Sequence, residues 1–344
     1  MAAEGIDAEN VTRWFEQNVK GVKPPLDFDL IAGGRSNLTF RVTDAAGQRF
    51  VLRRPPTSHV LPTAHDMGRE FRIISALQGT PVPVPPALGF CEDESVNQRP
   101  FYVMGFVEGQ ILRDAPAAEK TSPEIRRRIG ESLVDVLAAI HAVDPDDVGL
   151  GNLAKRDGYI ERQLNRWHKQ FEASKTREVP VIDEVYKTLL SRIPEQGPAC
   201  IVHGDYRLDN CLIGDSGEVA AVLDWELCTL GDPLADVGLL MVYWNDPDDE
   251  TRALGATATT LEGFPRKNEL VERYRQASGR NVSQLDFYIA FGYWKLACIL
   301  NGVYTRYAAG AMGNDGADFT GFADAVVQLG EAARAAAERL AATG

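Results

Sequence analysis

A change in the hydrophobic period separates the start of this chain from the rest. Between residues 28 and 53, apolar and polar side chains alternate in three segments, at 28–32, 38–43 and 49–53, with glycine-containing turns between them. Alternation with a period of two is typical of strands that bury one face. The short turns place consecutive strands side by side, so the region predicts an antiparallel meander.

Helical patterns flank the meander. Apolar residues at helical spacing predict one helix at about 6–20 and another at about 66–78. After a proline-rich connection, the apolar run 101–107 predicts a strand that is buried on both faces. We expect the smaller part of the chain to end there, as an N-terminal lobe at 1–107.

The remainder, 108–344, is expected to form a larger and mainly helical lobe with a helical insert at about 151–197. Short apolar strands are predicted at 199–202, 211–213 and 219–223, around a polar run. A Ser-Pro-Glu start predicts a helix at about 122–141, and two charged segments predict helices at about 157–175 and 180–193. The chain from 234 onward is expected to be mostly helical and to end in an amphipathic segment at 317–342. The order of elements places the chain in the α+β class.

The charge of the chain limits its partners. A formal net charge of −13 over 344 residues argues against the broad basic surface that nucleic-acid binders use. The apolar run 287–309 has the length of a membrane span, but it contains Lys295, Asn301 and Arg306, which favour a buried helix. The first ten residues lack the pattern of a signal peptide, so a cytoplasmic location is expected, without a membrane or nucleic-acid partner.

The polar run between the short strands contains the parts that phosphoryl transfer requires. Such a reaction needs a carboxylate to accept a hydroxyl proton, and oxygen ligands for Mg²⁺. Asp205 and Asn210 are five residues apart, as in the protein-kinase catalytic loop, and Asp224 ends the next strand fourteen residues later. Arg207 is near enough in sequence to offset charge on the γ-phosphate. A polar turn without catalytic function is the alternative.

The run His-Gly-Asp-Tyr-Arg-Leu-Asp-Asn at 203–210, followed by Asp-Trp-Glu at 224–226, resembles the aminoglycoside phosphotransferase and choline kinase family. The resemblance covers about residues 28–300 and implies a two-lobed protein-kinase-like fold, with a small antiparallel-sheet N-lobe and a larger helical C-lobe. It implies ATP and Mg²⁺ as cofactors. The implied roles are a base at Asp205, metal ligands at Asn210 and Asp224, and a loop support at His203.

Two further acids match a family feature. In the run Gly-Asp-Pro-Leu-Ala-Asp, the resemblance implies that Asp236 braces the catalytic loop from the following helix. A helix cap at Asp232 and a solvated first-turn acid at Asp236 are the alternatives.

The nucleotide is expected on the first lobe. The turn between the first two strands contains Gly33, Gly34, Ser36 and Asn37, and its glycines would let backbone amides approach phosphate oxygens. A plain hairpin turn is the alternative for this turn.

The third strand has Arg53 where the family usually has Lys, and Glu70 on the next helix is its expected partner. Met104 and Phe106 are expected in the hinge that holds adenine, with ordinary core as the alternative. The sequence does not separate ATP from GTP, or indicate an oligomeric state.

The acceptor is expected to be a small molecule with a hydroxyl group. Residues 155–178 carry seven Lys or Arg and four Asp or Glu, an excess of +3 that favours an anionic acceptor, although a solvated helix face is the alternative. The motifs at 51–56 and 203–210 look similar to the branch of the family fused to acyl-CoA dehydrogenases, which implies a hydroxy acid or hydroxyacyl-CoA. An aminoglycoside or choline-like alcohol kinase and a non-catalytic nucleotide-binding regulatory module remain alternatives. A protein kinase is disfavoured, because no Ala-Pro-Glu follows Asp224.

Overall fold

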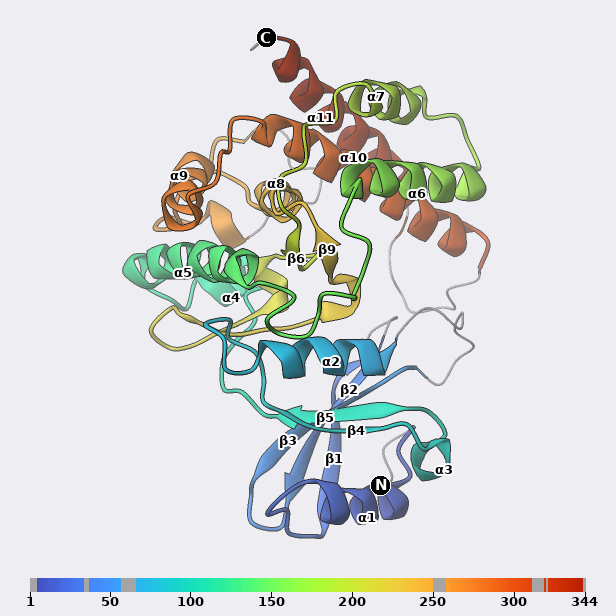
Figure 1. Ribbon diagram of the computed structural model, residues 1–344, viewed down its shortest axis with the longest axis vertical. Coiled ribbons are helices and arrows are strands. Elements are labelled where there is room, and N and C mark those ends of the chain that lie inside the picture. Colours follow the sequence, from blue (N-terminus) through green and yellow to red (C-terminus); the bar gives the residue numbers. More distant parts are fainter. Residues whose placement is uncertain are drawn as a thin grey trace. The chain divides into compact units, whose positions relative to one another are not determined.

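The computed structural model describes residues 5–33, 37–56, 66–249, 258–310, 319 and 321–342 (Figure 1). The chain divides into two compact units. The first contains the residues up to Gln110 together with 211–214 and 219–227, and the second contains 111–210, 215–218 and the chain from Cys228 onward.

Five strands of the first unit form one antiparallel sheet in the order β1-β2-β3-β5-β4. The predicted meander is therefore confirmed as β1 to β3. The fourth strand was not predicted, because glycine and neighbouring prolines hide its pattern. The strands are β1 (Leu26–Gly33), β2 (Leu38–Asp44), β3 (Arg49–Arg54), β4 (Ala87–Cys91) and β5 (Phe101–Gly105).

One helix covers each face of this sheet. α1 (Ala8–Asn18) packs with Phe101 and Val103 of β5 on one face, whereas Tyr102 points to the other face, where α2 (Met67–Leu77) lies. Successive side chains of a strand alternate between faces, so the central strand β5 is buried on both, as predicted. The short α3 (Glu94–Asn97) contacts α1.

Two later segments belong to the first unit although the sequence analysis placed them in the second lobe. β7 (Cys211–Ile213) and β8 (Val219–Val222) pair with each other, and the turn η2 (Trp225–Leu227) follows. The Val222 amide donates a hydrogen bond of 2.9 Å to Pro83, and Gln110 and Ile213 exchange two backbone hydrogen bonds of 2.9 Å. These bonds join residues far apart in sequence, which a boundary drawn along the chain cannot represent.

The second unit is mainly helical, as predicted. β6 (Cys200–Val202) pairs with β9 (Thr229–Gly231), which the sequence analysis did not predict. The predicted helices are present, with ends that differ by up to three residues, except that the predicted start at 317 lies outside the described residues. The helices and helical turns are α4 (Ala115–Ala118), α5 (Pro123–Ala142), α6 (Tyr159–Ser174), α7 (Pro180–Leu190), η1 (Leu208–Asn210), α8 (Leu234–Tyr243), η3 (Ala258–Thr260), α9 (Lys267–Ser278), α10 (Leu285–Ala308) and α11 (Phe322–Ala342).

The centre of the second unit is the pair of helices α8 and α10. Every residue from 234 to 242 of α8 is buried, and α10 packs against α8, α6, α7 and α11 (Figure 1). The apolar run 287–309 is therefore a core helix, because it is surrounded by other helices. None of the described helices has both the length and the apolar character needed to cross a membrane.

The close approach of α8 to α10 predicts a difference between two glycines. A Cβ atom at Gly238 would lie 2.5 Å from the backbone carbonyl of Tyr288, whereas a Cβ at Gly302 would have its nearest neighbour, an arginine nitrogen, at 3.7 Å. We expect Gly238→Ala to lower the free energy of unfolding by about 1–3 kcal/mol through overpacking. Gly302→Ala should raise it by up to about 1 kcal/mol, because alanine favours a helix. Denaturant unfolding measures both, and equal stability of the two variants would contradict this account of the packing.

Candidate functional site

In the first unit, Arg53 on β3 lies between two carboxylates. Its Nε atom is 3.1 Å from Oε2 of Glu70 on α2, and its Nη2 donates to Asp224. Glu70 is 2% exposed and also accepts a hydrogen bond of 2.8 Å from the Tyr102 hydroxyl. Burial alone would lower the pKa of Arg53, but the charge of Glu70 raises it, so the guanidinium stays charged. The predicted pairing of Arg53 with Glu70 is present.

The carboxylates of Glu70, Asp224 and Glu226 form a cluster of oxygen ligands. One carboxylate oxygen from each lies within 4.8 Å of the others. Three carboxylates and one guanidinium, that of Arg53, leave a formal charge of −2. Oxygen ligands with a net negative charge suit a hard divalent cation such as Mg²⁺. The sequence analysis gave no role to Glu226; its position two residues after Asp224 was the available signal.

The backbone at Asp224 turns sharply to present this carboxylate. Asp224 has a φ of 64°, in the left-handed region that few non-glycine residues occupy. Trp225 next to it is fully buried and donates through its indole Nε1 to the Val222 carbonyl at 3.1 Å. The buried indole holds the turn, and strained backbone of this kind is concentrated at functional sites.

Among the other residues that are predicted to bind the nucleotide, Asn37 contacts the carboxylate cluster. The Nδ2 atom of Asn37 donates at 3.4 Å to Glu70 and, at the same distance, to Glu226. Gly33 ends β1, whereas Gly34 and Ser36 lie outside the described residues. In β5 the Met104 side chain is buried, and the half-buried ring of Phe106 lies 4.5 Å below the Arg49 guanidinium. Nucleotide binding by these residues stays a prediction.

In the second unit, Asp236 of α8 holds the start of the loop 203–210, which the sequence predicts to be the catalytic loop. Its carboxylate accepts the backbone amides of His203 at 2.6 Å and Gly204 at 2.9 Å, and it contacts the ring of His141 at 3.4 Å. Burial alone would raise the pKa of Asp236, but the hydrogen bond from His141 and that from Gly204 hold it below its usual value. The predicted brace from α8 is present.

Asp232 has a different environment. It accepts the Leu234 amide at 3.0 Å and the Tyr288 hydroxyl at 2.7 Å. The N-cap position of α8 is occupied by Pro233, so the first of these bonds is a local turn in which Asp232 accepts the amide of the first helical residue. With the second bond, Asp232 ties the start of α8 to Tyr288 of α10.

Asp205 and Asn210 face each other across the loop. The Nδ2 atom of Asn210 donates to the Asp205 carbonyl at 2.8 Å and to its Oδ2 atom at 3.0 Å. Because the amide nitrogen is used in this way, the amide oxygen of Asn210 is the atom that can serve as a ligand. The Asp205 amide in turn donates to Nδ1 of His203 at 3.3 Å, so His203 supports the loop.

Arg207 lies beside Asp205. Its Nε atom is 3.6 Å from Oδ2 of Asp205, its Nη1 is 3.2 Å from Asp209, and its guanidinium lies 4.7 Å over the ring of Tyr243. Burial raises the pKa of Tyr243, and the charge of Asp205 adds to this effect. Sequence reasoning missed Asp209 and Tyr243, because helix α8 brings the tyrosine to the loop only in the folded chain.

A cavity of about 230 Å³ opens next to this group. Its apolar wall includes Leu112, Leu240 and Trp244, and its charged wall includes Arg113 and Arg207. The cavity therefore combines an apolar surface with guanidinium groups at the loop that carries Asp205.

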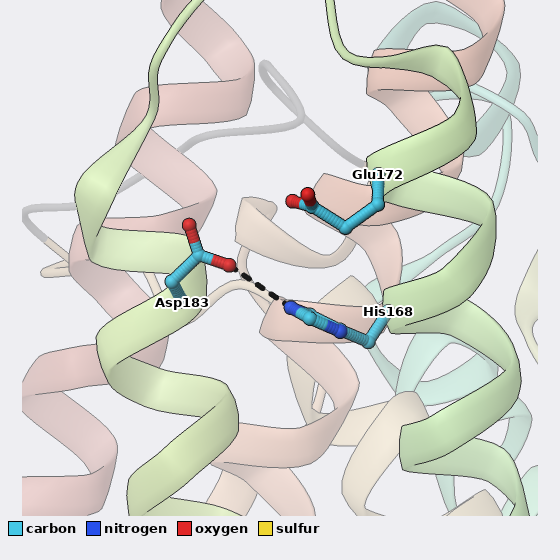
Figure 2. Close-up of side chains that lie close together, drawn as sticks. All are labelled: His168, Glu172 and Asp183. Atoms are coloured by element: carbon cyan, nitrogen blue, oxygen red, sulfur yellow. Dashed lines mark hydrogen bonds and ion pairs between the residues drawn. The ribbon is translucent and has the colours of Figure 1, made fainter.

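A second polar cluster lies away from the loop, where α6 faces α7. Figure 2 shows His168 and Glu172 of α6 opposite Asp183 of α7, with a hydrogen bond of 2.9 Å between His168 and Asp183. The ammonium group of Lys175 lies 3.4 Å from Glu172 and 3.5 Å from Asp183, and its hydrogen bond to Glu178 raises its pKa to about 12. The chain thus supplies its own cation to these carboxylates, and the cluster ties α6 to α7.

The environment of Asp236 predicts how stability depends on pH. Because its pKa in the folded chain is below the ordinary 3.8, its charge stabilises the fold above about pH 4, and this contribution is lost as the pH falls further. Asp236→Asn should cost about 3 kcal/mol at pH 7, since the loop amides lose a charged partner. Denaturant unfolding against pH, with exposed Asp215→Asn as the control, measures this. A difference that grows under acid would contradict it.

Comparison with known proteins supports the resemblance to phosphotransferases. Residues 27–279 match the model of the phosphotransferase enzyme family (APH). The chain is 37% identical over 290 residues to acyl-CoA dehydrogenase family member 10 of Mus musculus, which is 83% of this chain and 27% of that protein. The chain thus spans about a quarter of the length of this curated relative.

Solved structures of similar fold agree with the family match. A crystal structure from Ralstonia eutropha JMP134, provisionally assigned as an aminoglycoside phosphotransferase, is 34% identical, with a TM-score of 0.82 over 97% of this chain and 98% of that one. Aminoglycoside phosphotransferase APH(4)-Ia, in ternary complex with AMP-PNP and hygromycin B, shares the fold at 16% identity, with a TM-score of 0.62 over 96% and 97%. These likenesses confirm the predicted two-lobed, protein-kinase-like α+β fold. The chain belongs to the phosphotransferase enzyme family.

Proposed function

We propose that this chain transfers the γ-phosphoryl group of ATP to a hydroxyl group of a small molecule. The observation that carries the proposal is the arrangement of Asp205, whose carboxylate accepts from Asn210 at 3.0 Å and lies 3.6 Å from Arg207. A carboxylate that is held in place and partly exposed suits the base of a phosphotransferase.

The second unit supplies the acid–base chemistry of this proposal. The acceptor hydroxyl gives its proton to Asp205 while its oxygen forms a bond to phosphorus, and the bond from phosphorus to the ADP oxygen breaks. Arg207 offsets the negative charge that grows on the transferred group. His203 and Asp236 keep the loop in shape through their bonds to its backbone.

The first unit supplies the nucleotide and metal chemistry. Arg53 binds the α- and β-phosphates, Glu70 holds Arg53, and the main chain around Met104 and Phe106 binds adenine. Asp224 and Glu226 of this unit would hold Mg²⁺, with Asn210 as the predicted ligand from the second unit, and the metal would neutralise charge on the phosphates. The formal charge of −2 and the oxygen-only ligand set of the first unit support this assignment. The complex of APH(4)-Ia with AMP-PNP supports a nucleoside triphosphate as the donor.

The acceptor in this proposal is a hydroxy acid or its coenzyme A ester. The cavity beside Asp205 has an apolar wall for an acyl chain, with Arg113 and Arg207 for an anionic group. Its volume of about 230 Å³ suits a small acid or the reacting end of a longer chain. The excess of +3 in residues 155–178 and the relationship to an acyl-CoA dehydrogenase family member add support.

Removal of the base tests the reaction. Asp205→Asn keeps the shape of the side chain but cannot accept a proton, so we expect kcat to fall by at least about 100-fold. The measurement is ATP consumption with a panel of hydroxy acids, their coenzyme A esters, choline-like alcohols and aminoglycosides. The exposed Asp215→Asn is the matched control and should retain full activity.

The outcomes separate the candidate functions. Full activity of Asp205→Asn would refute the assigned base, and turnover of aminoglycosides alone would refute the anionic acceptor. Tight ATP binding by calorimetry without turnover on any acceptor would favour a nucleotide-binding regulatory module.

Glu226 gives a separate test of the metal assignment. Glu226→Gln removes one negative charge from the cluster with Glu70 and Asp224, so about 10-fold more Mg²⁺ should be needed for half-maximal activity. Glu218→Gln, an exposed residue outside the cluster, is the control. Titration of the rate with Mg²⁺ at fixed ATP measures the effect. An unchanged Mg²⁺ requirement would show that Glu226 does not contribute to the metal site.

A further inference from the structure

Lys295 is a buried charged residue to which the proposed reaction gives no role. It lies in the middle of α10 and is 7% exposed. Burial lowers its pKa, whereas the charges of Asp205 and Asp236 oppose this shift. No carboxylate of the described residues makes an ion pair with its ammonium group, whose contacts are a backbone carbonyl and the ring of Trp167 at 5.8 Å. Burying an ammonium group costs free energy, so a buried lysine without an ion pair points to a role for the contacts that it makes.

The carbonyl in question belongs to the catalytic loop. Nζ of Lys295 donates to the carbonyl oxygen of Gly204 at 3.0 Å. The amide of the same glycine donates to Asp236 at 2.9 Å. Gly204 has a φ of 85°, which a residue with a side chain rarely adopts. Two helices, α8 and α10, therefore hold the two backbone polar groups of Gly204 with charges of opposite sign.

This contact fixes the residue that follows. The carbonyl of Gly204 and the amide of Asp205 belong to one rigid, planar peptide unit. Lys295 holds the oxygen of that unit, and Nδ1 of His203 accepts its N–H at 3.3 Å. With the peptide plane held at both ends, the Cα atom of Asp205 is held in place, which restricts the positions that its side chain can reach.

We propose that Lys295 is a positioning residue, which orients the base Asp205 by holding the Gly204 carbonyl. The inference rests on the proposed function, because it matters for catalysis only if Asp205 is the base. Without the ammonium group, the peptide unit rotates more freely, and Asp205 spends less time in line with the acceptor hydroxyl. Small errors in such alignment have large effects on rate.

The test variant is Lys295→Met, which keeps most of the side-chain volume and removes the charge and the donor. We expect kcat to fall about 10- to 100-fold, while the KM for ATP stays unchanged. Lys295→Arg, which keeps a donor and a charge, should recover part of the lost kcat. Lys267→Met is the control, because it removes another lysine of the second unit, ion-paired with Asp249 and remote in sequence from the loop.

Hydrogen exchange gives a second reading that needs no turnover. In Lys295→Met, the amides of His203, Gly204 and Asp205 should exchange faster, whereas those of β6 and the core of α8 should not. If the wild-type chain proves inactive on every acceptor, the proposed function fails, but this exchange pattern still shows whether Lys295 orders the loop. If Lys295→Met does not fold, kcat and hydrogen exchange are measured on Lys295→Arg instead. A lower kcat with faster exchange confined to the loop would then support the proposal, and no change in either would contradict it.

Two results would overturn the proposal. One is an unchanged kcat in folded Lys295→Met. The other is hydrogen exchange that becomes faster to the same extent in α8, α10 and the loop. In that case the fraction of active protein would fall, whereas kcat per active site would not. The second result would mean that Lys295 serves only to stabilise the helices.

Discussion

The catalytic loop depends on the buried carboxylate of Asp236. Backbone amides that are removed from water need acceptors, and this single side chain accepts those of both His203 and Gly204. Because α8 is buried along almost its whole length, the carboxylate is fixed by the core of the second unit. Lys295 extends the same principle from α10, where it holds the Gly204 carbonyl. The rigidity of two packed helices is thereby transmitted to a short loop without regular structure.

In the first unit, three neighbouring carboxylates need a cation beside them. Three carboxylates, Glu70, Asp224 and Glu226, lie together and would repel one another without a cation. Arg53 partly neutralises them, and its planar guanidinium contacts Glu70 and Asp224 through different nitrogens. A lysine has a single ammonium group, so the Arg that departs from the usual family residue is suited to bridging two acids. The remaining negative charge is what a divalent cation requires.

Membership of the phosphotransferase enzyme family is consistent with the proposed phosphoryl transfer but does not identify the acceptor. Folds and catalytic loops are shared widely, whereas acceptor choice in the proposed reaction depends on the walls of the cavity beside Asp205. Here those walls combine Leu240 and Trp244 with Arg113 and Arg207. Such a surface matches an acid with an apolar chain better than a polycationic sugar, which would meet guanidinium groups of its own sign.

Much of this protein could be predicted from sequence because its signals are local. The period of two indicated β1 to β3, and the spacing of Asp205, Asn210 and Asp224 led to the reaction that we propose. Contacts between segments far apart in sequence were not predictable: the attachment of Val222 to Pro83, the approach of Tyr243 to the loop, and the bond from Lys295 to Gly204. Lys295 illustrates the limit, because its position in an apolar run indicated a buried helix and nothing more. The sequence by itself determined the chemical groups and the local elements, whereas the tertiary structure decided which groups meet, because packing alone brings α8 and α10 to the loop.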